Sequence, residues 1–388
     1  MDGSFRIGRL FGIPLHIHFT FLLVIVIFAW IIGTQIQYTV TMLTDIFNTV
    51  GTAAGLNPVT IDTSLIETGF MPYIFGVIVS LGLFFGVFIH ELAHSLVARR
   101  NGIRIRSITL LLFGGVTQMD EDSLPDPKVE LPVALVGPIT SLLFGLLCCA
   151  LVYAVPLAVA SAPFAGALVF LFAYLGLLNI ILFLFNLLPA FPMDGGRVLR
   201  AFLATRMPLH QATRIAANVG KAFAIIFGIV GVLFLNPFLL IIAFFIWIGA
   251  DSEATAMQYS HNLENVTLGD IMTPVVHTVP PNMPILHVID QMYATKHLGF
   301  PVVDKGVLIG MVTVADVQRI SSIDRDAMQV RDVMSRDTVT MPPEAPVIDA
   351  LRFMSAHDIG RIPVVKDGQI MGIVTRTDIL KVIQLKEI

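Results

Sequence analysis

The stretch FFGVFIHELAHSLVARR, residues 84–100, decides the class of fold. It completes an apolar run that begins near residue 71, and a helix of about 20 such residues crosses the hydrocarbon of a membrane. Three polar side chains, His90, Glu91 and His94, interrupt the run. Ionisable groups are costly inside a membrane and mark functional sites there. The stretch therefore predicts a membrane-spanning helix that carries chemistry.

The spacing of the three polar residues is typical of a zinc hydrolase. His90 and His94 are four positions apart, so they share one helix face and lie about 5–6 Å from each other, close enough for both imidazoles to bind one ion. Glu91 is rotated away from that face, which keeps it off the metal and near its water, as in the H-E-x-x-H pattern. A pair of packed histidines beside a buried carboxyl is the structural alternative, and a position inside a membrane argues against it.

A third ligand is expected from the segment NLLPAFPMDGGRVLR, residues 186–200. Pro189 and Pro192 end regular helix, and the glycine pair at 195–196 permits a tight turn after Asp194. Broken backbone at membrane depth is tolerated where it lines a cavity. We therefore expect Asp194 to supply an oxygen ligand beside the two histidines. Taken alone, the segment is more typical of an ordinary interfacial Asp-Gly-Gly turn, and the ligand is favoured only together with the second span.

Charge is unevenly distributed along the chain, which excludes several classes of protein. The 388 residues are 55% hydrophobic and only 13% charged, whereas about 25% is usual in a soluble domain. Of the charged residues, 25 lie in 1–260 and 27 in 261–388. A disordered chain, a collagen-like chain and a single soluble domain are excluded. The net charge of −4, without a basic cluster, argues against nucleic acid as a partner.

Apolar segments of spanning length predict a polytopic α-helical membrane protein of about six transmembrane helices. The segments lie near 16–34, 71–97, 131–157, 164–188, 212–235 and 237–250. Arginines precede the first segment and follow the second and the fourth, whereas the loop 35–70 has neither Lys nor Arg. Cytoplasmic loops carry the excess of positive charge, so both termini are expected in the cytoplasm. The loop 35–70 is expected outside, either as a cap or as a surface hairpin.

A repeat at an offset of 62 residues fills the soluble part. Thr313 with Asp316, for example, recurs as Thr375 with Asp378. Each unit predicts alternating helices and strands and is too small to bury its apolar face alone, so the two units are expected to pack as one α/β module. The predicted organisation is a membrane domain at 1–250, a linker at 251–265 and two repeats at 266–327 and 328–388.

These signatures resemble the site-2 proteases, which are intramembrane zinc metalloproteases, in the form that carries a carboxyl-terminal pair of CBS domains. The H-E-x-x-H helix and a later Asn–Pro–Asp-Gly segment match His90–His94 and Asn186–Gly195, and the repeat matches a tandem CBS pair. The resemblance implies a multi-pass protein of the cell membrane that cleaves a peptide bond of a transmembrane substrate helix. It also implies one Zn²⁺ per chain, held by His90, His94 and Asp194, with Glu91 as the base.

Two further segments are given roles by the resemblance. The apolar segment 110–118, which contains Gly114 and Gly115, is too short to cross the membrane and resembles a membrane-embedded strand whose edge could pair with an extended substrate. Asn186, eight residues before Asp194, could donate a hydrogen bond to the developing oxyanion. The structural alternatives are a re-entrant packing loop for the first and a helix-capping or interhelical amide for the second.

The CBS resemblance implies a site for an adenine nucleotide. CBS pairs commonly bind such nucleotides between their repeats, with an Asp at the ribose and a Thr three residues earlier, and Thr313 with Asp316 and Thr375 with Asp378 match these positions. ATP, ADP or AMP would then modulate the protease, and the CBS domains would form a homodimer. The structural alternative is a purely dimerising module in which the acids are helix N-caps.

A CBS-regulated membrane transporter or channel is the alternative function. It would use the buried polar groups as an ion pathway. Transporters usually show repeated halves within the membrane, and the sequence has no such repeat there. The peptidase is therefore favoured.

Overall fold

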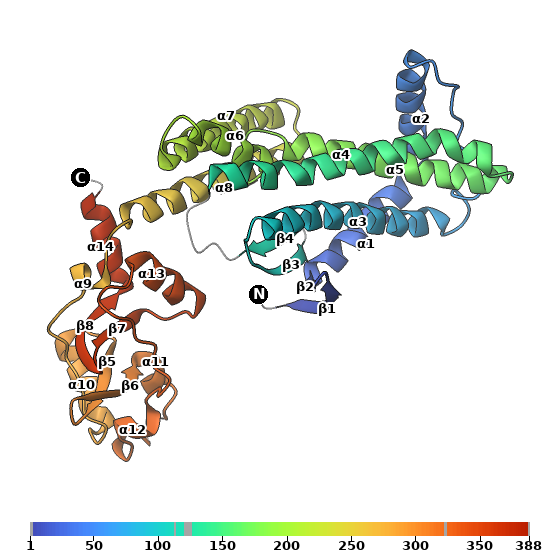
Figure 1. Ribbon diagram of the computed structural model, residues 1–388. Helices are drawn as coiled ribbons and strands as arrows, with labels where there is room; N and C mark the ends of the chain where they lie inside the picture. Colours follow the sequence, from blue (N-terminus) through green and yellow to red (C-terminus); the bar gives the residue numbers. More distant parts are fainter. Residues whose placement is uncertain (1–2, 112–113, 120–125, 322–323, 387–388) are drawn as a thin grey trace. The chain divides into compact units, whose positions relative to one another are not determined.

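The chain divides into two compact units, Met1–Thr255 and Ala256–Ile388. The computed structural model (Figure 1) describes residues 3–111, 114–119, 126–321 and 324–386. The segment 251–265, expected to link the two units, is helical as far as Asn262. Each unit is described by itself.

Five described helices of the first unit are long and apolar enough to cross a membrane. Large apolar side chains lie exposed on these helices, Leu146 and Ile229 among them, and such surfaces are stable against lipid tails. The first unit is therefore a polytopic α-helical membrane domain. The helices are α3 (Met71–Arg100), α4 (Pro127–Ala158), α5 (Ala162–Asn186), α7 (Leu209–Leu233) and α8 (Pro237–Asn262).

Long antiparallel helices and an ion pair between two of them organise this unit. α4 and α5 run side by side along their length (Figure 1). In α7, Lys221 donates to Asp251 of α8 over 2.6 Å, so each of the two charges has a partner of opposite sign. The sixth predicted segment was expected to end near 250, where the apolar run ends. α8 continues for three further turns, to Asn262, as a polar helix.

The first predicted span, near 16–34, is helical from residue 19 and is followed by a sharp bend. α1 (Phe19–Thr34) and α2 (Ile36–Ala53) are bent by 80° at the break between them, so the membrane domain has six spans only if this pair counts as one. α2 falls in the segment expected to be a cap or a hairpin. Its Leu43 and Phe47 are buried in the same core as Phe170 of α5, and Asn48 exchanges two hydrogen bonds with Val59 beyond the helix.

A four-stranded sheet was not predicted from the amino-terminal segment. Its order is β1-β2-β3-β4, with β2 and β3 parallel and the outer pairs antiparallel, so β4 is an edge strand. Within the segment 110–118, residues 112 and 113 lie outside the described residues, and the remainder forms the end of β3 and most of β4. The strands are β1 (Ser4–Leu10), β2 (Ile13–His18), β3 (Ile105–Leu111) and β4 (Gly114–Met119).

The corner after α5 places Asp194. α5 ends at Asn186, and α6 (Asp194–Ala204) begins with the acid itself. The expected turn at Gly195 and Gly196 is wrong, since both glycines are helical. They are needed because the backbone of the corner packs against them: a Cβ on Gly195 would lie 2.1 Å from the carbonyl oxygen of Leu188.

The second unit consists of two interleaved α/β repeats. In each, an antiparallel strand pair follows a helix, and the pairings Gly299–Thr313 and Arg361–Thr375 preserve the offset of 62. Bridges such as Thr273–Ile373 and Met311–Ser335 join one repeat to the other. The elements are α9 (Leu268–Ile271), α10 (Ile285–Thr295), β5 (Gly299–Asp304), β6 (Val307–Thr313), α11 (Val314–Gln318), a 3-10 turn (Asp324–Asp326), α12 (Val330–Val333), α13 (Val347–Ala356), β7 (Arg361–Lys366), β8 (Gln369–Thr375) and α14 (Arg376–Lys386).

Candidate active site

His90, His94 and Asp194 form a compact cluster between α3 and α6. The Nε2 atoms of the two histidines lie 3.1 Å apart, and each lies 3.1 Å from Oδ2 of Asp194. Both imidazoles are buried, and the carboxylate is 14% exposed. Three ligand-type atoms from residues 100 positions apart thus converge on one point.

The remaining nitrogen of each imidazole is held by α4. His94 Nδ1 lies 2.6 Å from the carbonyl oxygen of Val133, so Nδ1 carries the proton and donates it. His90 Nδ1 lies 2.9 Å from the hydroxyl of Ser141. This arrangement fixes both rings, and the proton on Nδ1 of His94 leaves the lone pair of its Nε2 directed into the cluster. Metal-ligating histidines are commonly held in this way through their other ring nitrogen.

The cluster fits a tetrahedral cation. With Zn–N bonds of about 2.0–2.1 Å, the ligand atoms of a tetrahedral zinc site are about 3.3 Å apart, close to the triangle of 3.1 Å sides found here. Two neutral imidazoles and one carboxylate are a ligand set that zinc favours, and three protein ligands leave a fourth position open. The residues present therefore suit a catalytic zinc ion.

Gly137 allows α4 to come this close. A Cβ at this position would lie 2.1 Å from His94 Nε2 and 2.7 Å from His90 Nε2. The bulkier Val136 before it does not prevent the approach, because the glycine itself faces the cluster. Sequence reasoning missed Val133 and Ser141 as parts of the site, although each lies four residues from Gly137 and so on the same face of α4.

Glu91 lies beside the cluster and faces β4. Its Oε2 accepts a hydrogen bond of 2.8 Å from the hydroxyl of Thr117, and a Cβ on Gly115 would lie 2.2 Å from its Cγ. The edge strand thus packs directly on the acid of the H-E-x-x-H helix. Thr117 was also missed, because nothing in the sequence indicates which hydroxyl of a strand meets the helix.

The contacts of Gly114 and Asn186 do not by themselves assign either residue a role in the site. Gly114 begins β4 with φ of +128°, a conformation that favours glycine. Asn186 is the last residue of α5, and its Nδ2 donates to the carbonyl oxygen of Leu182 over 3.0 Å. This bond is the intrahelical contact that the structural alternative describes, and it uses one of the two N–H groups of the amide.

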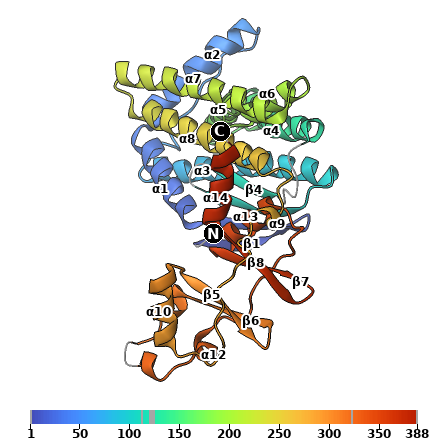
Figure 2. The same ribbon diagram turned by 90° about the vertical axis from the view of Figure 1, so that its left-hand side faces the viewer.

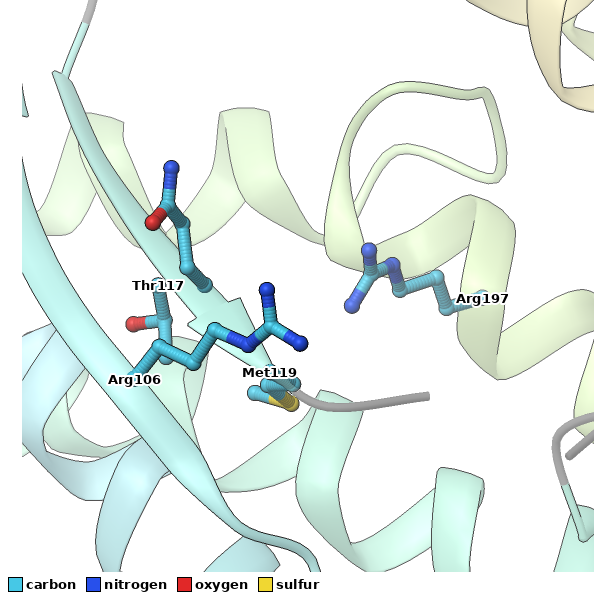
Figure 3. A pocket seen from close by; sticks show the side chains of 5 residues that line it. Arg106, Thr117, Met119 and Arg197 are labelled. Carbon is cyan, nitrogen blue, oxygen red and sulfur yellow. The ribbon is translucent and has the colours of Figure 1, made fainter. Parts of the chain in front are cut away.

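A pocket of about 370 Å³ adjoins this site (Figure 3). It is lined by Arg106 of β3, by Arg197 of α6 and by Thr117, Gln118 and Met119 of β4. Thr117 therefore belongs both to the pocket wall and to the surroundings of Glu91.

The second unit holds a larger pocket between its repeats. It has a volume of about 580 Å³, and its lining includes Thr313, Asp316 and Arg361. Thr375 and Asp378 do not line it. Burial lowers the pKa of Arg361, whose guanidinium nevertheless stays protonated at neutral pH. In both matching pairs the Thr hydroxyl donates to the Asp carboxylate over 2.6 Å, which closes a capping box at the start of a helix.

Comparison with known proteins identifies the family. The sequence profile of Peptidase family M50 matches residues 78–166 and 152–227, and that of the CBS domain matches 268–322 and 330–385. Zinc metalloprotease MJ0392 of Methanocaldococcus jannaschii is 32% identical over 388 residues, which cover 100% of this chain and 98% of that protein. The chain belongs to the site-2 protease family.

Two solved structures are similar to parts of the chain. The site-2 protease from Methanocaldococcus jannaschii is 33% identical, with a TM-score of 0.42, and the match covers 65% of this chain and 95% of that one. The CBS pair of protein MJ0100, in complex with 5′-methylthioadenosine and S-adenosyl-L-methionine, is 26% identical, with a TM-score of 0.29, over 31% of this chain and 98% of that one. The chain is thus an intramembrane zinc metallopeptidase of the site-2 protease type with CBS domains, and the peptidase replaces the alternative of a transporter or channel.

Proposed function

We propose that the protein hydrolyses a peptide bond of transmembrane substrates, with one zinc ion held by His90, His94 and Asp194 and with Glu91 as the general base. The observation that carries the proposal is the triangle of ligand atoms with 3.1 Å sides, beside a carboxylate and an edge strand. When bound, zinc supplies a Lewis acid that lowers the pKa of a water to about 7 and polarises the scissile carbonyl.

The chain's own residues move the proton and position the reactants. Glu91 removes a proton from the attacking water and returns it to the leaving amine, so it is a carboxylate again after each turnover. Thr117 holds one carboxylate oxygen through its 2.8 Å hydrogen bond, which leaves the other oxygen for the water. The second N–H of the Asn186 amide is the candidate donor to the oxyanion.

The substrate is proposed to bind as a strand. A helical substrate hides its carbonyls in its own hydrogen bonds and must extend before attack. β4 ends the sheet of the described residues with an unpaired edge, to which another backbone can add. A Cβ on Gly114 would meet nothing within 4 Å, whereas Gly115 lies against Glu91. Glu91 packs against this strand, so a peptide added to β4 would pass close to the base.

The test is cleavage of a single-span model substrate by the purified chain in liposomes, with zinc content measured in parallel. Glu91→Gln is expected to retain one zinc per chain and to lose cleavage, because the amide keeps the shape and cannot accept the proton. Asp194→Asn is expected to lose zinc as well. A Glu91→Gln protein that cleaves at the wild-type rate would refute the assignment of the base, and wild-type protein that binds no zinc would refute the site.

A second proposal is that an adenine nucleotide binds in the pocket between the CBS repeats and modulates cleavage. Its volume of about 580 Å³ suits a nucleotide, and Arg361 supplies a positive charge for phosphate while Asp316 has a free carboxylate oxygen. Titration calorimetry with AMP, ADP and ATP tests binding, and the cleavage rate at saturation tests modulation. Modulation requires a different affinity in two states of the protease, so a rate unchanged by all three nucleotides would remove it.

Topology and assembly complete the proposal. Both termini are proposed to be cytoplasmic, because of the arginines that follow the second and fourth predicted spans, and the CBS domains are proposed to form a homodimer. Labelling of a cysteine added at either end of the chain, from outside intact cells, tests the first point. The mass of the detergent-solubilised protein by light scattering, with and without residues 256–388, tests the second.

A further inference from the structure

The pocket of about 370 Å³ beside the catalytic residues carries two arginines. Arg197 lies on α6, one turn after Asp194, and Arg106 lies on β3. Figure 3 shows their guanidinium groups pointing toward each other across the space. The remaining lining residues of the pocket, Thr117, Gln118 and Met119, are uncharged.

Arg197 has no hydrogen bond or ion pair within the part of the chain that the structure describes. The positive charge of Arg197 therefore has no counterion among the described residues, and an anion in the cavity is favoured. The guanidinium fork matches a carboxylate or a phosphate with two parallel hydrogen bonds. The part of the pocket beside Arg197 is therefore suited to a small oxyanion.

The pocket is connected to the catalytic base by one side chain. Thr117 lines the pocket and donates to Glu91 over 2.8 Å. The other two β4 residues of the lining follow Thr117 directly, and α6, which carries Arg197, begins with the third ligand residue of the proposed zinc site. The pocket is thus enclosed by the edge strand and the ligand-bearing helix and not by the helices that face lipid.

We propose that this pocket binds the side-chain carboxylate of an Asp or Glu in the substrate and so determines which peptide bond is cut. The inference rests on the proposed binding of an extended substrate to β4. A strand rises about 3.3 Å per residue, so the pocket, at Thr117–Met119, lies about 7–13 Å along the strand from Gly115, where Glu91 packs. The acid therefore lies two to four residues from the scissile bond.

The experiment compares Glu with Gln in the substrate. A neutral single-span substrate is cleaved by the full chain in phosphatidylcholine liposomes, its cut site is determined by mass spectrometry, and each position two to four residues from the cut is replaced in turn by Glu or Gln. At one position, wild type is expected to cleave the Glu substrate with a kcat/KM at least tenfold above that of the Gln substrate, through a lower KM. In Arg197→Gln this ratio is expected to fall to about one.

Two further variants guard against a merely misfolded protein. Arg197→Glu is expected to prefer a substrate with Lys at the same position, a gain that an unfolded protein cannot show. Arg206→Gln removes an equal charge two residues beyond the end of α6, where the guanidinium stacks 5.3 Å over the ring of Phe202 and not in the pocket. It is expected to keep the wild-type Glu-to-Gln ratio.

Three outcomes would overturn the inference. One is a Glu-to-Gln ratio near one at every position in wild type, or a ratio that Arg197→Gln leaves unchanged. Another is a change in the cleavage rate of the neutral substrate by Arg197→Gln that is found only in liposomes with phosphatidylglycerol. The anion bound by Arg197 would then be a headgroup phosphate. The third concerns the acids at 120–122, which follow Met119 in the sequence. If their replacement by amides changes cleavage of the neutral substrate as Arg197→Gln does, the anion that pairs with Arg197 belongs to the chain itself and not to the substrate. If wild type cleaves neither the neutral substrate nor any of its Glu variants, the proposed function itself fails.

Discussion

Gly137→Ala is the substitution that tests the geometry of the proposed zinc site most directly. The new methyl group would lie 2.1 Å from His94 Nε2 and 2.7 Å from His90 Nε2, whereas ordinary contacts begin at 3.4 Å. Either an imidazole or α4 must move by about 1 Å. Neither movement is compatible with the hydrogen bonds that Val133 and Ser141 make to the same two rings.

The expected loss of zinc affinity follows from this displacement. Ligand distances in metal sites tolerate deviations of about 0.2 Å, so a shift of about 1 Å removes at least one histidine ligand or its second-shell partner. Loss of a group that hydrogen-bonds to a ligating histidine costs, by itself, about 10–100-fold in metal affinity. We therefore expect zinc to bind at least 100-fold more weakly. The fold is expected to survive, since overpacking costs about 1–3 kcal/mol and the better helix propensity of alanine returns about 1 kcal/mol.

The assay is competition for zinc with a chromophoric chelator at pH 7, together with the thermal midpoint by circular dichroism in detergent. Gly145→Ala is the matched control. It lies two turns further along the same helix and tightens contacts with Ile180, at 3.0 Å, without reaching the histidines. Wild-type zinc affinity in Gly137→Ala would refute the close approach of α4 on which the account of the site depends.

Three other contacts are tested by substitution. Thr117→Val removes the hydrogen bond to Glu91, the proposed base, and is expected to lower kcat about tenfold with KM little changed, and Thr117→Ser is expected to restore kcat. Arg200→Met leaves the buried Glu130 carboxylate without its partner, and we expect a loss of about 3–5 kcal/mol in the free energy of unfolding, measured in denaturant. Asp316→Asn is expected to weaken AMP binding in calorimetry, while Asp378→Asn, outside the pocket, is expected to leave it unchanged. Equal effects of the two Asn variants would contradict the assignment of the pocket.

Local spacing predicted the parts of the site that lie within one element. Positions four apart on a helix share a face whatever surrounds them, so the pairing of His90 with His94 follows from the sequence and the structure has it. The approach of Asp194 was predicted because prolines must end α5 near it. The family resemblance, which the comparisons confirm, joined the two segments.

The contacts between elements could not be predicted in this way. Whether Gly137 or Val136 faces the histidines depends on how α3 and α4 cross, and no spacing within one sequence encodes the crossing. The strand β2 did leave a signal, since Ile13, Leu15 and Ile17 alternate with other residues. It was missed because the apolar run of the following helix begins at the same place. α2 was missed because its amphipathic pattern lies in a segment too polar to suggest a membrane helix.

α4 organises the site without supplying a ligand. Its Val133 and Ser141 orient the two histidines, and one turn before Val133 its Glu130 accepts hydrogen bonds from Arg200 of α6. The same helix therefore fixes both halves of the ligand set, the imidazoles of α3 directly and Asp194 through the helix that bears it. Arg200 also pairs with Glu253 of α8. One guanidinium thus joins α6 to both α4 and α8, so the position of α6 depends on both charge pairs. A change at any of these pairs is consequently expected to reach the proposed metal ligands through α4 and α6, before it reaches Glu91, which is held by β4.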